Sequence, residues 1–240
     1  MSKIFKGFAL ALSMLTTLPF FRVHDFYKGI NGYAVMFYPL VGLLLGSILY
    51  GISLLLEPYV PHFHLGMILF ALWVVLTGAL HLDGFADTVD GLFVSKERSL
   101  EVMKDPHNGG MGMLFGGTFL LLKASSLMAL EHYALLPLVL LLPRLMIVWS
   151  IYFYPYVSGG MSSLAKEELN ATQVISALLY SLVFVYIYSG WFLLFGALFL
   201  LLLIKSFFIK RYGGFTGDIY GFTIEVIELF LLNLIIVGLV

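Results

Sequence analysis

The sequence predicts an all-α, polytopic membrane protein, and three observations lead to this fold class. Hydrophobic residues make up 61% of the 240 residues, whereas charged residues make up only 11%. Soluble domains contain about 45–50% apolar and about 25% charged residues. The mean hydropathy is +1.00, and the apolar residues are gathered into runs that approach the roughly 20 residues needed to cross a bilayer.

The composition also excludes several classes of protein. With 13 Lys and Arg and 14 Asp and Glu, the chain could not cover the surface of a soluble domain of this size with charged groups. Disorder is excluded because disordered chains are poor in apolar residues. The formal net charge of −1 gives no basic field for nucleic acid. The absence of cysteine excludes disulfide frameworks and thiol chemistry.

Seven apolar stretches are long enough, or nearly long enough, to span a membrane. They lie at about residues 33–56, 62–82, 111–131, 134–155, 172–189, 190–209 and 221–240. Only Ser189-Gly190 separates the fifth stretch from the sixth, which predicts a tight turn there. We therefore expect about seven transmembrane helices in a single integral membrane domain, residues 1–240, since the chain shows no repeat and no low-complexity linker.

A shorter apolar run, residues 4–21, precedes these stretches and contains Pro19 near its end. Because it is short, we expect an interfacial or re-entrant N-terminal helix in preference to an eighth span. No cleavage site of the A-x-A kind follows this run, so we do not expect it to be a removed signal peptide.

The basic residues predict the orientation of the chain in the membrane. Loops 22–32, 83–110, 156–171 and 205–217 together contain nine Lys and Arg residues, whereas loops 57–61, 132–133 and 189–190 contain none. Loops rich in Lys and Arg stay in the cytoplasm, so we expect these four loops on the cytoplasmic side. Within them, residues 94–104 are expected to form a short solvated helix, and Lys166, Glu167 and Glu168 a solvated loop.

The first acidic cluster lies at the end of the second apolar stretch. Asp83, Asp87 and Asp90 are spaced by four and three residues, so on a helix they fall within an arc of about 60°. A divalent cation such as Mg²⁺ would relieve the repulsion between three carboxylates on one face. The alternative is a solvated helix end, although no Lys or Arg occurs between His81 and Val94. His81 could contact a phosphate or only cap the membrane interface.

The second acidic cluster begins in the last predicted cytoplasmic loop. Asp218, Glu225 and Glu228 are spaced by seven and three residues, which places them within an arc of about 80° on a helix. Thr216 is a plausible N-cap, and the glycine-rich loop ending at Gly217 would present N–H groups to an anion. Carboxylates inside an apolar span are costly and normally face a cavity or a partner. The alternative to metal binding is therefore a structural pair with a buried cation.

Other polar residues complete the expected site. Residues 105–110, which begin with Asp105 and include two glycines, could enclose a phosphate or form a turn that caps the next helix. Lys123 and Arg144 lie inside apolar runs and could neutralise a phosphate or a carboxylate. The expected catalytic residues are Asp83, Asp87, Asp90 and Asp218. The expected metal ligands are these four with Glu225 and Glu228. The expected substrate-binding residues are His81, Asp105, Lys123, Arg144, Thr216 and Gly217.

Three phrases of the sequence resemble the cobalamin synthase family, the adenosylcobinamide-GDP ribazoletransferases. They are HLDGFADTVDG at 81–91, MKDPHNGGMG at 103–112 and KRYGGFTGDIYGFTIEVIE at 210–228. The resemblance runs nearly from end to end. It implies a magnesium-dependent transferase in the bacterial inner membrane, with its active site facing the cytoplasm. Its substrates would be adenosylcobinamide-GDP and α-ribazole or the 5′-phosphate of α-ribazole, and GMP would be released as the nucleotide loop of vitamin B12 is assembled.

The resemblance carries over to individual residues. Positions that match the family's motifs are Asp83, Asp87, Asp90, Asp105, Arg144, Asp218, Glu225 and Glu228. There are also departures, because Thr17 stands where many members have arginine, and Pro106-His107 stands where the family usually has serine and arginine. A substrate role of those arginines cannot be transferred to this chain.

Two other functions compete with this interpretation. A CDP-alcohol-type membrane phosphotransferase also uses aspartates and divalent metal. Its signature begins like Asp83-Gly84 here, but it requires Ala-Arg near the place that Asp87 occupies, and the later spacing differs. A non-enzymatic cation transporter would place Glu225, Glu228 and Lys123 along an ion path. Transport predicts acidic residues near the middle of the membrane, whereas most of the acidic residues here flank one side.

Overall fold

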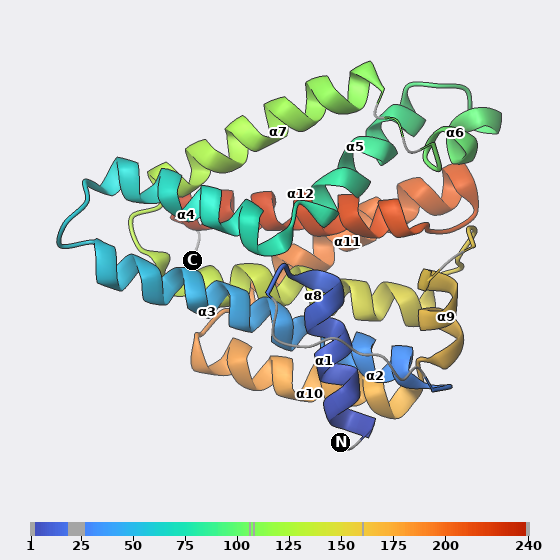
Figure 1. The fold of residues 1–240 in the computed structure, drawn as a ribbon, viewed down its shortest axis with the longest axis horizontal. Coiled ribbons are helices and arrows are strands. Elements are labelled where there is room, and N and C mark those ends of the chain that lie inside the picture. Colours follow the sequence, from blue (N-terminus) through green and yellow to red (C-terminus); the bar gives the residue numbers. More distant parts are fainter. Residues whose placement is uncertain (1–2, 19–26, 106, 108, 160, 239–240) are drawn as a thin grey trace.

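The protein is described by a computed structural model, in which residues 3–18, 27–105, 107, 109–159 and 161–238 are placed. Within these residues the regular elements are α-helices and one short 3₁₀-helix, with no β-strand (Figure 1). The elements are α1 (Lys3–Leu15), α2 (Ile30–Met36), α3 (Tyr38–Leu56), α4 (His62–Thr77), α5 (Leu80–Leu92), α6 (Lys96–Val102), α7 (Gly110–Ala129), η1 (Tyr133–Leu135), α8 (Leu136–Phe153), α9 (Met161–Glu168), α10 (Ala171–Ile187), α11 (Trp191–Tyr212) and α12 (Gly217–Ile236).

Five helical segments are long and apolar enough to cross a membrane by themselves. They are α3, α7, α8 together with η1, α11 and α12. Two bent pairs, α4 with α5 and α9 with α10, pass the same test when each pair is taken together, which gives up to seven spans. The predicted fold class, a polytopic all-α membrane protein, is confirmed.

The N-terminal helix α1 has 13 residues, so it is about 20 Å long and too short for a hydrocarbon core of about 30 Å. Its position in the interface stays a prediction, and residues 19–21 of the expected segment lie outside the described residues. The turn predicted at Ser189-Gly190 is confirmed, since α10 ends at Ile187 and α11 begins at Trp191. The short helix predicted within residues 94–104 is also confirmed, as α6.

The stretch 62–82 is not one continuous helix, contrary to the prediction. It is broken after Thr77, and α5 leaves α4 at an angle of 84°. Gly78 and Ala79 both adopt left-handed backbone conformations, with φ of 61° and 55°. Thr17 stabilises the C-terminal end of α4, because its hydroxyl donates a hydrogen bond to the Val75 carbonyl at 2.9 Å. As a result, α5 turns aside and carries the first acidic cluster across the bundle instead of along α4.

Helix α8 forms the centre of the bundle. In the segment Tyr133–Phe153, 83% of the spanning window is buried inside the protein, whereas the figure for Trp191–Tyr212 is 28%. Helices α3, α10, α11 and α12 all pack against α8. The apolar side chains of α8 therefore form the core, while α11 presents most of its apolar surface outward, as expected for contact with lipid.

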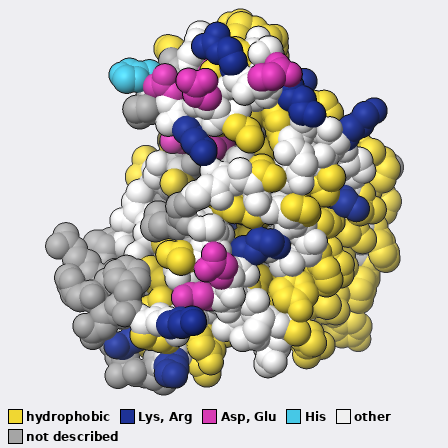
Figure 2. Space-filling view, turned by 90° about the vertical axis from the view of Figure 1, so that its right-hand side faces the viewer, with side chains coloured by type: hydrophobic (Ala, Val, Ile, Leu, Met, Phe, Trp, Pro, Cys, Tyr) yellow, Lys and Arg dark blue, Asp and Glu magenta, His cyan; other side chains and the backbone are white. Residues whose placement is uncertain are grey.

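The four loops predicted to share one side of the membrane contact one another. The backbone N–H of Asn31 donates to Glu168 at 2.9 Å, and the N–H of Val157 donates to the Phe215 carbonyl at 2.9 Å. Arg211 donates to the Leu92 carbonyl at 3.3 Å. Figure 1 shows α6, α9 and the α11–α12 connection at one end and the α3–α4 connection at the other. Figure 2 views the first end and shows Lys, Arg, Asp and Glu side chains spread across it.

Lys166 and Glu168 are not simply solvated loop residues, so that expectation is wrong for both. The Lys166 ammonium donates to the carbonyls of Ile151 and Tyr154 at 2.9 and 2.7 Å, which satisfies carbonyls at the C-terminus of α8. The Glu168 carboxylate accepts from the backbone and side chain of Asn31. These two residues join α9 to α8 and α2.

A cysteine-labelling experiment tests this arrangement of loops. We expect Ser95→Cys and Lys210→Cys, at exposed positions, to react with a membrane-impermeant thiol reagent from the same side of sealed vesicles. Tyr59→Cys, where the native side chain is 84% exposed, should react only from the other side. The chain has no native cysteine, so no background labelling interferes. Labelling of Ser95→Cys and Lys210→Cys from opposite sides would contradict the fold.

Candidate functional site

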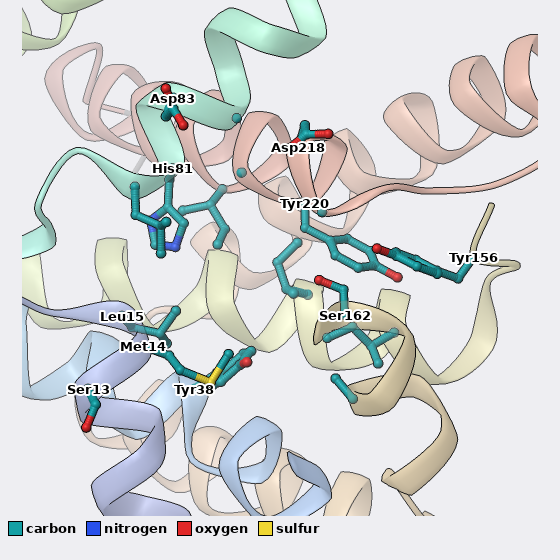
Figure 3. Close-up of a pocket in the computed structure, with 18 of the residues that line it drawn as sticks. Ser13, Met14, Leu15, Tyr38, His81, Asp83, Tyr156, Ser162, Asp218 and Tyr220 are labelled. Atoms are coloured by element: carbon teal, nitrogen blue, oxygen red, sulfur yellow. The ribbon is translucent and has the colours of Figure 1, made fainter. Parts of the chain in front are cut away.

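A cavity of about 600 Å³ lies at the end of the bundle where the basic loops meet (Figure 3). Asp83, Asp218 and His81 lie along one side of the cavity, and Met14, Leu15 and Tyr38 lie on the opposite side. The complete lining is Ser13, Met14, Leu15, Tyr38, Leu80, His81, Asp83, Gly84, Ile147, Ile151, Tyr156, Gly159, Ser162, Ala165, Gly217, Asp218, Tyr220, Gly221 and Ile224.

Two glycines allow α5 and α12 to meet backbone to backbone beside this cavity. A Cβ atom at Gly84 would lie 3.0 Å from the Asp218 carbonyl oxygen, and one at Gly221 would lie 2.9 Å from the His81 carbonyl oxygen. Real Cβ contacts are rarely this short, so any side chain at either position would push the helices apart. The crossing places Asp83 of the first cluster and Asp218 of the second in the lining of one cavity.

The three aspartates of α5 have different surroundings. Asp83 is exposed, Asp87 is half-buried and Asp90 is buried. Asp87 lies within electrostatic reach of Asp83, Asp218 and Asp90. The two carboxylate oxygens of Asp90 accept hydrogen bonds from the backbone N–H groups of Gly109 at 2.7 Å and Gly112 at 2.8 Å. Asp90 therefore stabilises the N-terminus of α7, where unpaired N–H groups attract negative charge.

The arrangement fits a divalent cation that is completed by substrate. Among the described residues, no group of three or more His, Asp or Glu side chains is placed to hold a metal ion by itself. Mg²⁺ usually binds through one or two carboxylates together with substrate phosphates and water. Asp83 and Asp218, from two helices in contact and facing one cavity, supply such a pair of carboxylates.

The start of α12 is organised as the sequence predicts. The Thr216 hydroxyl oxygen accepts from the N–H of Ile219 at 3.2 Å, which confirms the expected N-cap. The same hydroxyl lies 3.3 Å from a carboxylate oxygen of Asp218, to which it donates. Gly217 lines the cavity beside Asp218. The cap therefore fixes the first turn of α12 and orients the Asp218 carboxylate.

Two other predicted substrate-binding residues lie in contrasting places. His81 lines the cavity and is only 5% exposed, and its Nδ1 atom has no hydrogen-bond partner among the described residues. Asp105 is exposed and does not line the cavity. It accepts hydrogen bonds from the backbone and the ring of His107, and these bonds hold the pKa of the Asp105 carboxyl below its usual range. Pro106 and Asn108 lie outside the described residues.

Glu225 and Glu228 form a buried ion network with Lys123 and Arg144. The Lys123 ammonium lies 2.7 Å from Glu225 Oε2 and 2.5 Å from Glu228 Oε2. Arg144 Nη1 lies 2.8 Å from Glu228 Oε1. The Lys123 ammonium also lies 4.3 Å from the ring centroid of Trp73, an attractive geometry for a cation above an aromatic face. Two cations and two anions balance the charge of the network.

This network corresponds to the structural pairing left open by the sequence. All four charged residues are at most 5% exposed, and none of them lines the cavity. They come from α7, α8 and α12, so the network joins three spans inside the bundle. Both carboxylate oxygens of Glu228 are engaged by cations. The geometry thus favours a structural role for Glu228, while Asp83 and Asp218 face the open space.

Sequence reasoning did not identify the aromatic part of the cavity. Tyr38, Tyr156 and Tyr220 line it together with Ser162. The position of Tyr220, two residues after Asp218, was the one signal available. Tyr38 and Tyr156 reach the cavity from α3 and from the α8–α9 connection, and no local pattern marks such distant residues as neighbours.

The ion network predicts a specific effect on stability. Glu228→Gln should lower the free energy of unfolding by about 3–5 kcal/mol, because removing one partner leaves buried charge uncompensated. Thermal or denaturant unfolding of the purified protein in detergent would measure this change. Adding Arg144→Met to Glu228→Gln should restore part of the lost stability.

Glu57→Gln is the matched control, because Glu57 is exposed at the end of α3. Such a surface change should alter the free energy of unfolding by no more than about 0.5 kcal/mol. If Glu228→Gln were as stable as the control, the network would not hold α7, α8 and α12 together.

The chain resembles known proteins over almost its entire length. A family model described as cobalamin-5-phosphate synthase matches residues 7–236. An adenosylcobinamide-GDP ribazoletransferase of Thermosynechococcus vestitus is 41% identical, with 83% of this chain and 84% of that protein covered.

Two further relatives carry the same name. That of Desulforamulus reducens is 34% identical, with 98% of both chains covered. That of Acinetobacter baumannii is 37% identical, with 96% of this chain and 97% of that protein covered. No solved structure matches the chain. The resemblance noted in the three sequence phrases is confirmed, and the chain belongs to the cobalamin-5-phosphate synthase family.

Proposed function

We propose that this protein is an adenosylcobinamide-GDP ribazoletransferase, which joins adenosylcobinamide-GDP to ribazole or its 5′-phosphate and releases GMP in the assembly of the cobalamin nucleotide loop. Relatives with this name match it over most of their length. The observation that carries the proposal is the cavity in which Asp83 and Asp218, from two separate motifs, face the same space.

The reaction is a phosphoryl transfer. A ribazole hydroxyl oxygen forms a bond to the phosphorus on the cobinamide side of the diphosphate. The bond from that phosphorus to the bridging oxygen breaks, and GMP leaves with the electron pair. The hydroxyl proton passes to a base, for which a carboxylate beside the cavity is suited. Catalysis of this kind depends mostly on positioning and charge neutralisation, which the α5–α12 crossing and the Thr216 cap support.

We propose that Asp83 and Asp218 hold Mg²⁺. Asp87 lies within electrostatic reach of both carboxylates, so its carboxylate would also attract the bound ion. The ion would neutralise the diphosphate and stabilise the leaving GMP. Asp90 would act from α5 in another way, by keeping the α6–α7 connection against the site through Gly109 and Gly112. His81 Nδ1, buried and unpartnered among the described residues, would bind a polar group of a substrate.

We further propose that the site opens to the cytoplasm of the cell, in the inner membrane. Three of the four basic loops, 83–110, 156–171 and 205–217, contribute residues to the cavity. The four loops together contain nine Lys and Arg residues, and such loops stay inside. A nucleotide-linked substrate and the released GMP would then meet the enzyme on the side where nucleotides are made.

Changing the cavity carboxylates tests the metal and the function together. Asp83→Asn and Asp218→Asn should each lower GMP release by at least about 100-fold. Changing a residue that only supports a metal ligand costs about 10- to 100-fold in activity, and loss of a direct ligand should cost no less. The assay uses purified protein with both substrates and Mg²⁺, and it measures GMP and the completed corrinoid. Part of the loss should be recovered at high Mg²⁺, because the variants bind the ion more weakly.

Glu101→Gln is the matched control, since Glu101 is an exposed carboxylate of α6 that does not line the cavity. It should retain GMP release. Near-normal turnover of Asp83→Asn and Asp218→Asn at limiting Mg²⁺ would remove these residues from the active site. Absence of GMP release from the unmodified protein, with both substrates present, would contradict the proposed function itself.

A further inference from the structure

The cavity has two chemically different halves. Its acidic side contains Asp83 and Asp218, whereas Met14 and Leu15 of α1 lie on the opposite side (Figure 3). Further apolar side chains of the lining are Ile147, Ile151 and Ile224. A ligand that fills the cavity must therefore combine an apolar part with a polar part that reacts at the carboxylates.

Aromatic rings line the wall between these halves. The rings of Tyr156 and Tyr220 are nearly parallel, with centroids 6.0 Å apart and an interplanar angle of 21°. Tyr220 also stacks on Phe215 at 5.6 Å. Figure 3 shows the Tyr156 and Tyr220 rings side by side above Ser162. Tyr220 thus already packs against two rings, so the half-buried Tyr156 is the tyrosine of this pair that has ring surface left for stacking of another planar ring.

The buried hydroxyl of Tyr220 in this wall is left unpaired by the part of the chain that the structure describes. Tyr220 is only 6% exposed, and its hydroxyl has no hydrogen-bond partner among the described residues. A buried hydroxyl without a partner destabilises a protein, so an acceptor supplied by a ligand would remove this cost. The aromatic wall therefore offers one hydrogen-bond donor within largely apolar surroundings.

Size separates the two substrates of the proposed reaction. A cavity of about 600 Å³ falls within the range of about 300–1,000 Å³ that encloses a drug-sized ligand. Adenosylcobinamide-GDP contains a corrin macrocycle with its side chains, an adenosyl group and a nucleotide, and it is far larger than such a ligand. Ribazole is a single nucleoside and matches the cavity in size.

The chemistry of the base points to the same substrate. The base of ribazole is a dimethylated benzimidazole, a flat apolar ring system with one free ring nitrogen that accepts a hydrogen bond. Guanine has several donors and acceptors, each of which needs a partner when buried. We infer that the apolar half of the cavity binds the benzimidazole of ribazole, which stacks on the tyrosine wall and accepts a hydrogen bond from Tyr220.

This inference rests on the proposed function and adds a division of the site between substrates. With the base among the apolar side chains, the ribose of ribazole extends toward Asp83 and Asp218, where its hydroxyl meets the diphosphate. Adenosylcobinamide-GDP then approaches from the open, charged end of the bundle and inserts only its diphosphate between the carboxylates.

Filling the cavity tests the division directly. Ser162→Phe places a large ring beside Tyr156 and Tyr220, and Ser206→Phe makes the same change at an exposed position of α11. We expect Ser162→Phe to weaken binding of α-ribazole at least about tenfold, the equivalent of about 1.4 kcal/mol. Equilibrium dialysis of α-ribazole with purified protein, without Mg²⁺ and without the second substrate, measures this. Ser206→Phe should bind α-ribazole like the unmodified protein.

Tyr220→Phe provides a second variant that keeps the ring and removes only the hydroxyl. Loss of one hydrogen bond should weaken α-ribazole binding by about 2- to 10-fold. In the transferase assay, the KM for α-ribazole should rise by a similar factor, while the KM for adenosylcobinamide-GDP stays within about twofold. This variant is nearly isosteric, so it decides the matter if Ser162→Phe does not fold.

Two results would overturn the inference. A rise in the KM for adenosylcobinamide-GDP without a change for α-ribazole would assign the cavity to the nucleotide half of the larger substrate. Unchanged α-ribazole binding in both variants would show that the cavity holds neither base. Failure of the proposed function gives a different result, because the unmodified protein would then release no GMP. Binding of α-ribazole, and its loss in Ser162→Phe, can still be measured in that case.

Discussion

The close crossing of α5 and α12 is the constraint on which the site depends. Glycine at positions 84 and 221 lets the two backbones meet, and this contact brings Asp83 and Asp218 to one cavity although 134 residues separate them along the chain. The crossing exists because the left-handed residues Gly78 and Ala79 turn α5 away from α4. A straight continuation of α4 would carry the aspartates away from α12.

The buried charges keep α12 in place beneath this crossing. Lys123 of α7 and Arg144 of α8 bind the two glutamates of α12, so three spans share one neutral network in the buried interior of the bundle. Charged groups in a membrane interior are tolerated when they pair with each other. None of these four residues lines the cavity, whereas Asp218 and Tyr220 at the start of α12 do. Along α12, the two glutamates that pair with buried cations are thus separated from Asp218, which lines the cavity.

Much of the fold could be predicted from the sequence because hydropathy and charge determine it directly. The helical class and most spans followed from the apolar runs, and the Thr216 cap followed from local residue type. The bend at Gly78-Ala79 could not be predicted, because an apolar run looks the same whether it is straight or broken. The hydrogen bonds of Asp90 to Gly109 and Gly112 and the place of Tyr156 beside Tyr220 depend on tertiary contacts, which spacing along the chain does not encode.

The proposed metal site requires Asp83 and Asp218 to hold one divalent cation at the cavity that both residues line. Anomalous diffraction at the manganese edge, from crystals grown with Mn²⁺ and GDP, tests it most directly. We expect one anomalous peak in contact with carboxylate oxygens of both Asp83 and Asp218. A peak bound by Glu225 and Glu228, with their contacts to Lys123 and Arg144 broken, would contradict it.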